Sequence, residues 1–192
     1  VGSEMCIRDR ASSETNCKEF LRPYLAEAVA SVCGDDVELC AVCVAKGMEF
    51  LNAPYETIQK VTEELVRSDG ERYCFSKSQE EVDTLLWEAQ LKYVFPLVEN
   101  YRRYFVKKYY DFIKAALPIN NGYGDQVMVP EEAELGNLMY LVERGGIPVS
   151  AEESMELKRY RKARNELAHM NLLSNEELCV ILKAGKHKTA SD

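Results

Sequence analysis

The side chains with the clearest chemical capacity lie on a predicted helix over residues 157–169, LKRYRKARNELAH. Lys158, Arg161, Asn165 and His169 share one side of this helix, and Arg164 sits on the flank of that side. Arg161, Asn165 and His169 follow one another at intervals of four residues, so they form one stripe along a helix. Five of the eight residues 157–164 are basic, in a chain whose net charge is −8. This local reversal of sign suits an anionic ligand. The opposite side of the helix carries the residues that we expect to be buried, Tyr160, Ala163, Leu167 and Met170.

The sequence from Arg164 to His169, RNELAH, matches the RNxxxH form of the R-x4-6-H motif of HEPN domains. The resemblance covers residues 80–184 and includes a long first helix, the LPI segment at 117–119 and the ELG segment at 134–136. It implies an all-α helical bundle. Many bacterial proteins that resemble it are metal-independent endoribonucleases of toxin–antitoxin or anti-phage systems. The resemblance also implies a homodimer in which two motif helices face each other across one RNA site.

The residue types fit the chemistry that the resemblance implies. His169 is assigned the acid–base role, because the ordinary pKa of an imidazole lies near neutrality. Arg164 is assigned the stabilisation of charge on the phosphoryl oxygens, and Asn165 the orientation of the imidazole or the phosphate. Lys158 and Arg161 are expected to hold flanking phosphates. The expected products are a 2′,3′-cyclic phosphate and a 5′-hydroxyl, with no cofactor and no metal.

Other interpretations of the same residues stay open. The chain could hold a non-catalytic HEPN domain that binds RNA or nucleotide, or that dimerises at the C-terminus of a larger ATPase-type protein. It could also be a regulatory scaffold without a ligand. His169 alone fits a helix-end histidine whose charge favours the C-terminal carbonyls. No glycine-rich phosphate loop occurs in the sequence, so an ATPase would lie upstream, and an antitoxin would be a separate partner.

Composition narrows the functional classes. An acidic chain is not a general nucleic-acid binder, so any contact with RNA would be local. No apolar run approaches 18 residues, which predicts no membrane span. Outside Cys6, six cysteines lie mostly in apolar helical patterns, as expected for reduced thiols in a cytoplasm. Cys40 and Cys43 form a C-x2-C pair without a second ligand pair, so we expect buried thiols rather than a metal site.

Four segments are predicted along the chain. Residues 1–10, VGSEMCIRDR, match the translation of a transposon-end adapter used in sequencing libraries, so we expect them to be an artefact and the natural protein to continue upstream. Residues 11–77 are predicted to form a helical or winged-helix-like module. Residues 78–185 are predicted to form the HEPN-like domain, and residues 186–192 a flexible tail.

The first module is predicted to hold helices over 21–33, 37–47 and 55–66, followed by a short hairpin with a two-residue turn at Asp69 and Gly70. Three helices and a hairpin are typical of a winged helix. A packing module is the favoured interpretation over a DNA-binding one, because Glu56, Glu63 and Glu64 on the third helix would repel phosphate.

The second module is predicted from its capping residues. Ser78, Ser150 and Ser174 are each followed by a glutamate three residues later, which predicts three helix starts. The first helix is expected to kink or break at Pro96 and to end by Pro118. A loop over 118–130 follows, and then a helix over 131–143 that is expected to be closed by Gly145 and Gly146. The last two helices are expected to end near His169 and at Gly185.

Overall fold

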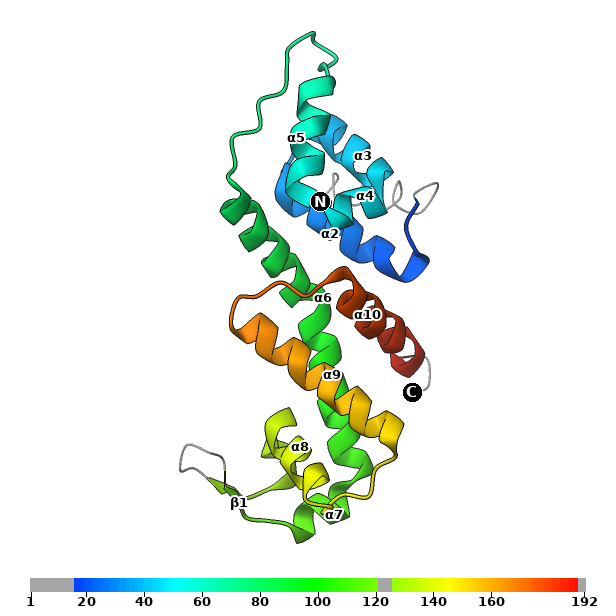
Figure 1. Cartoon of the computed structure of the whole chain (residues 1–192), viewed down its shortest axis with the longest axis vertical. Helices are drawn as coiled ribbons and strands as arrows, with labels where there is room; N and C mark the ends of the chain where they lie inside the picture. The colour runs from blue at the N-terminus through cyan, green and yellow to red at the C-terminus, as the bar shows by residue number, and fades with distance from the viewer. Residues whose placement is uncertain (1–15, 121–125, 190–192) are drawn as a thin grey trace. The chain divides into compact units, whose positions relative to one another are not determined.

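The computed structural model describes residues 16–120 and 126–189, and its regular structure is mostly helical, which confirms the all-α class (Figure 1). The sheet within the described residues is a small antiparallel pair of β1 (Ile119–Asn120) and β2 (Gln126–Val127). Contacts divide the chain into two compact units. Among the described residues, the first unit holds Asn16 to Tyr93 and those from Met170 onward, and the second lies between Val94 and His169. None of the described helices is both long and apolar enough to cross a bilayer.

The first unit is a bundle of short helices built around α2. Its elements are η1 (Glu19–Leu21), α2 (Arg22–Cys33), α3 (Val37–Lys46), α4 (Met48–Asn52), α5 (Pro54–Glu64), the first turns of α6 (Gln79–Lys108) and α10 (Asn175–Thr189). Helix α3 packs against α2 and α5, and α10 packs against η1. Leu25, Phe50 and Ile58 are fully buried in this core. The three helices predicted here are confirmed, and α4 is an additional turn between them.

A buried amide joins α6 to the segment before α10. Gln90 is 3% exposed. Its oxygen accepts a hydrogen bond from the Leu173 backbone N–H at 2.7 Å, and its nitrogen donates to the Leu173 carbonyl at 3.1 Å and to the Tyr24 hydroxyl at 3.3 Å. Residues distant in sequence are therefore tied together by a side chain whose polar atoms are all satisfied.

The predicted hairpin is a three-residue turn rather than a two-residue one. The Gly70 N–H donates to the Arg67 carbonyl and the Arg67 N–H to the Glu71 carbonyl, so the loop comprises Ser68, Asp69 and Gly70. Only Gly70 in this loop has a positive φ, 87°, which is the geometry of a type I turn followed by a left-handed glycine. The pairing beyond it is a single bridge between Val66 and Arg72, so no two-stranded wing forms here.

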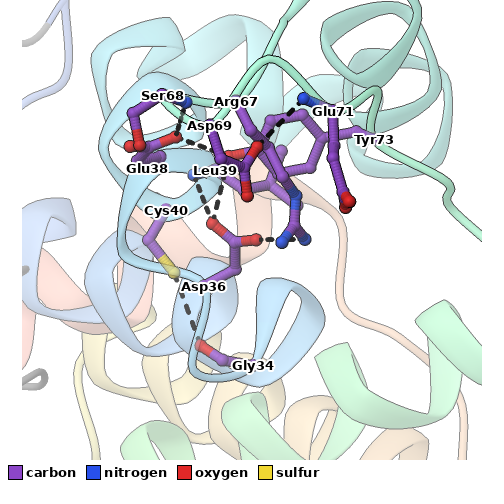
Figure 2. A network of polar contacts seen from close by, with 10 residues as sticks. All are labelled: Gly34, Asp36, Glu38, Leu39, Cys40, Arg67, Ser68, Asp69, Glu71 and Tyr73. Atoms are coloured by element: carbon purple, nitrogen blue, oxygen red, sulfur yellow. Dashed lines mark hydrogen bonds and ion pairs between the residues drawn. The ribbon is translucent and has the colours of Figure 1, made fainter.

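Polar contacts hold this turn against the start of α3 (Figure 2). Arg67 forms an ion pair with Asp36 at 2.9 Å, and the Ser68 N–H donates to Glu38 at 3.2 Å. The Tyr73 hydroxyl donates to both carboxylates. Asp36 also caps α3 by accepting from the Leu39 N–H at 3.0 Å. All of these contacts lie within the first unit and hold the turn in place there.

The second unit contains the C-terminal part of α6, which contacts the last helix of this unit through a pair of stacked tyrosine rings. Its other elements are α7 (Tyr110–Ala115), β1, β2, η2 (Pro130–Glu132), α8 (Leu135–Glu143) and α9 (Ala151–Ala168). Helix α8 packs against α9 (Figure 1). Tyr101 of α6 stacks on Tyr160 of α9, with ring centroids 4.0 Å apart and planes 7° apart. Phe105, Leu138 and Leu157 are fully buried in this unit, and the ring centroid of Phe105 lies 6.1 Å from that of Tyr101.

The three predicted capping boxes are all present. The Ser78, Ser150 and Ser174 N–H groups donate to the glutamates three residues later, and each serine hydroxyl accepts in return from the glutamate N–H. The glycines at the end of α8 also act as predicted. Gly145 has a φ of 73°, and Gly146 donates to the Leu141 carbonyl at 2.8 Å, which closes the helix.

Several element boundaries were predicted incorrectly. The break that was one of the two outcomes predicted at Pro96 does not occur, because helix α6 continues through this exposed residue, with buried Val94 and Val98 on either side of it. The interruption falls at Tyr109 instead, between α6 and α7. The single helix predicted over 131–143 is divided into η2 and α8, because Ala133 and Glu134 between them are extended.

The end of the chain also differs from its prediction. Met170 is 64% exposed rather than buried, because its positive φ of 60° turns the chain away after α9. Helix α10 continues past Gly185 to Thr189, since an internal glycine costs a helix only about 1 kcal/mol. The predicted artefact at residues 1–10 and the last three residues of the predicted tail lie outside the described residues. The two compact units do not coincide with the predicted segments, because α6 contributes residues to both units.

Candidate active site

The rotation of α9 is set by its capping residue and its buried side. Glu153 closes the capping box and also accepts from the Lys108 ammonium and, at 2.8 Å, from the Tyr109 hydroxyl at the end of α6. The Lys108 contact is the main reason that the pKa of Glu153 falls to about 2. The buried side of α9 consists of Leu157, Tyr160, Ala163 and Leu167. The basic side of the helix therefore faces outward.

The structure leaves the predicted site residues accessible from that outer side. Lys158 and Arg161 are exposed, Arg164 and Asn165 are half-buried, and His169 is exposed. His169 is the residue that ends α9, and its N–H donates to the Asn165 and Glu166 carbonyls at 3.1 Å each. The imidazole is thus presented at a helix end and is not sealed in the core.

Arg164 is the member of the motif with the most defined surroundings. One terminal nitrogen forms an ion pair with Glu134 at 2.9 Å, and the other lies 3.5 Å from the Asn165 side-chain oxygen. The side chains of Arg164 and Glu134 are 41% and 66% exposed. The Asn165 amide therefore contacts the guanidinium in this structure. An exposed pair of this kind stabilises the fold by only about 0–1 kcal/mol, so an anionic ligand can replace the carboxylate.

Glu134 is positioned by contacts that begin on α6. Its N–H donates to the Asn137 side chain at 2.9 Å at the start of α8. Arg102 stabilises the turn before Glu134, because its guanidinium donates to the carbonyls of Glu131 at 2.7 Å and Ala133 at 3.1 Å. Glu99 holds Arg102 in turn, with oxygens 2.9 and 2.7 Å from two of its nitrogens. The hydrogen bonds from Arg102 lower the pKa of Glu99, and those to Glu99 raise the pKa of Arg102.

A cleft of about 300 Å³ opens where these elements meet, entirely within the second unit. It is lined by Phe95, Val98, Glu99, Arg102, Glu131, Glu132, Glu134, Leu135 and Arg164. The cleft combines an apolar wall with two guanidinium groups and four carboxylates. Arg164 is the single residue shared by the cleft and the predicted motif.

Sequence reasoning singled out Arg164 but did not find the residues that surround it. Glu134 was noticed within the ELG segment, with no chemical role. Glu99 and Arg102 are spaced i, i+3 on a helix, which is a weak signal because such pairs are common on solvated surfaces. Nothing in the sequence shows that Arg102 reaches two backbone carbonyls of a segment 29 and 31 residues away.

The cysteine cluster of the first unit has the character of packed thiols. Cys33, Cys40 and Cys43 are buried, and Cys40 donates to the Gly34 carbonyl at 3.5 Å (Figure 2). Hydrogen bonding with Cys40 raises the pKa of Cys33, which disfavours its thiolate. Within the part of the chain that the structure describes, no group of three or more His, Cys, Asp or Glu side chains is arranged to hold a metal ion.

Comparisons of the chain with known protein families, with curated proteins and with solved structures found no match. The function of the chain is therefore inferred from the geometry of the site and from the chemistry of its residues.

Proposed function

We propose that the chain is a metal-independent endoribonuclease that acts as a homodimer in a bacterial toxin or anti-phage setting. The observation that supports this most strongly is the presentation of Arg164 and His169 by one helix, both accessible to solvent, with Arg164 at the edge of a cleft. Lys158 and Arg161 lie exposed on the same helix, and no ion pair engages them within the described residues. They are available to contact phosphates on either side of the scissile bond.

In the proposed reaction the ribose 2′-oxygen attacks the adjacent phosphorus. The 2′-hydroxyl gives its proton to a neutral imidazole, and the bond from phosphorus to the 5′-oxygen of the next nucleotide breaks. That 5′-oxygen leaves with a proton from an imidazolium, which gives a 2′,3′-cyclic phosphate and a 5′-hydroxyl. Arg164 stabilises the charge that grows on the phosphoryl oxygens with paired N–H donors.

This reaction needs one group to take a proton and one to give a proton. A single chain offers one imidazole at the motif, because the sequence holds only two histidines and His187 is not part of the motif. Two copies of α9 facing each other would supply a second His169. Dimerisation is therefore part of the proposal and not an addition to it.

The test is cleavage of total RNA in the presence of EDTA, with the ends of the products mapped. We expect wild type to leave cyclic phosphate ends, and His169→Ala and Arg164→Ala each to lower the rate by about 100-fold or more. His187→Ala and Arg159→Ala are matched controls, one histidine and one exposed arginine outside the proposed site. Cleavage that EDTA abolishes, or that persists in His169→Ala, would contradict the proposal.

The ion pair between Arg164 and Glu134 favours a second candidate, a non-catalytic domain that binds RNA or nucleotide or only dimerises. A carboxylate occupies the guanidinium that the reaction would use. Such a domain would keep its affinity for RNA in His169→Ala and would release no cyclic phosphate ends in any variant. A domain that only dimerises would bind no RNA at low salt.

A further inference from the structure

The cleft beside Arg164 has an apolar wall that a phosphate does not need. Phe95, Val98 and Leu135 form that wall, and Phe95 is 46% exposed. A nucleobase has flat apolar faces, and aromatic side chains commonly receive it by stacking. A volume of about 300 Å³ is enough for a purine ring system. The shape and the wall of the cleft therefore suit a base.

The polar lining then selects among the bases. Glu131 and Glu132 are exposed at the cleft, and neither forms an ion pair within residues 16–120 and 126–189. An ionised carboxylate only accepts hydrogen bonds. Guanine is the RNA base with two adjacent donors on its Watson–Crick edge, N1–H and the 2-amino group, which two carboxylate oxygens can accept together. Adenine, cytosine and uracil place an acceptor beside their donor, and that acceptor would face a carboxylate oxygen.

Charge also orients the nucleotide. The cleft carries four carboxylates and would repel a phosphate, whereas α9 presents Lys158 and Arg161 outside it. Arg164 stands at the boundary, since it lines the cleft and belongs to the basic helix. A nucleotide bound here places its base in the cleft and its 3′-phosphate at Arg164.

We propose that this cleft is a guanine-binding pocket, so that the chain cuts RNA on the 3′ side of guanosine. The position of the cut rests on the proposed nuclease function, whereas binding of the base does not. The two ideas can therefore be tested apart.

The binding test uses calorimetric titration of the full chain with 3′-GMP, 3′-IMP, 3′-AMP and 3′-UMP. We expect 3′-GMP to bind about tenfold more tightly than 3′-AMP or 3′-UMP, because it alone pairs two donors with a carboxylate. Since 3′-IMP lacks the 2-amino group, its affinity should fall between them. The double variant Glu131→Gln with Glu132→Gln should remove most of the preference for guanine. Phe95→Ala should lower the affinity for all four nucleotides. Glu143→Gln, the same change on α8 outside the cleft, should leave all affinities unchanged.

Equal affinity for the four nucleotides would overturn the proposal of a guanine-binding pocket. A preference for guanine that persists in the double variant would overturn it as well. Cleavage of a defined RNA supplies the second arm. Cuts after guanosine support the pocket and the nuclease together, whereas cuts after every base overturn the pocket and leave the nuclease standing. Selective binding of 3′-GMP without any RNA cleavage supports the pocket and overturns the nuclease.

Discussion

Gln90 in the first unit and Arg164 in the second each bridge segments that are distant in sequence, yet their surroundings are opposite. Gln90 is 3% exposed, and its amide oxygen and both amide hydrogens can be assigned to partners. The side chain of Arg164 is 41% exposed, and its polar partners among the described residues are a solvent-exposed carboxylate and, at 3.5 Å, a neighbouring amide. A guanidinium carries five N–H donors, so several of them remain available to a ligand.

The difference shows how to separate a structural polar residue from a functional one. A buried polar group with every partner present stabilises one conformation, and losing it leaves other buried groups unsatisfied. An exposed cation in a weak ion pair adds little to the free energy of unfolding and can exchange its partner. Four substitutions sharpen this comparison, each predicted to act mainly on stability or mainly on binding.

Gln90→Leu should have the largest effect. It leaves the buried N–H and C=O groups of Leu173 without partners, at a cost of about 3 kcal/mol in the free energy of unfolding. Urea unfolding followed by circular dichroism measures this loss. Gln59→Leu is the matched control, because Gln59 is exposed and its side-chain amide donates to the exposed Tyr55 hydroxyl. If Gln90→Leu lowers the free energy of unfolding by less than about 1 kcal/mol, the hydrogen bonds between Gln90 and Leu173 do not stabilise the fold as proposed.

Arg102→Leu should come next, because Arg102 is intermediate between the two cases. Its side chain is 20% exposed, and it fastens the Glu131 and Ala133 carbonyls while lining the cleft. We expect a loss of about 2 kcal/mol in stability, together with weaker binding of 3′-GMP. Arg103→Leu is the control, because that side chain is 73% exposed and, within the described ranges 16–120 and 126–189, forms an ion pair with Glu99 alone. Equal losses of stability in the two variants would contradict the role of Arg102 in holding the Glu131 and Ala133 carbonyls.

Acid should remove a third contribution, that of Glu153. Its pKa is about 2 when folded, against an ordinary 4.5, so the ionised carboxylate stabilises the fold above pH 4.5. That contribution disappears as the pH falls toward 2. Because the side chain is 26% exposed, we expect about 1 kcal/mol. Glu153→Gln should therefore be less stable than wild type at pH 7 and equal to it near pH 2. Glu152→Gln, its exposed neighbour, should match wild type at both.

Local sequence signals predicted much of the fold, because they act over a few residues. The serine–glutamate spacings located three helix starts, and Gly145 located the end of α8. The failures arose where packing outweighs local preference. The helix passes through Pro96 because its neighbours are buried, and Gly185 does not end α10.

The candidate site was predictable to the same extent. The four-residue spacing of Arg161, Asn165 and His169 needed only the helical repeat, and their accessibility followed from the apolar residues opposite. The partner of Arg164 could not be predicted. Glu134 contacts Arg164 because α8 packs on α9. The two residues are 30 positions apart in the sequence, so no local pattern indicates the pair.

Glu134→Gln should have the smallest effect on stability and the most informative effect on binding. Removing the charge should change the free energy of unfolding by less than about 0.5 kcal/mol, because the ion pair is exposed. It should also free Arg164 for phosphate and tighten the binding of 3′-GMP and of RNA by about two- to fivefold. Glu143→Gln, equally charged and remote from Arg164, controls for the general change in charge. Weaker binding in Glu134→Gln would instead mean that the carboxylate orients the guanidinium, and Arg164 would then resemble Gln90 in needing its partner in place.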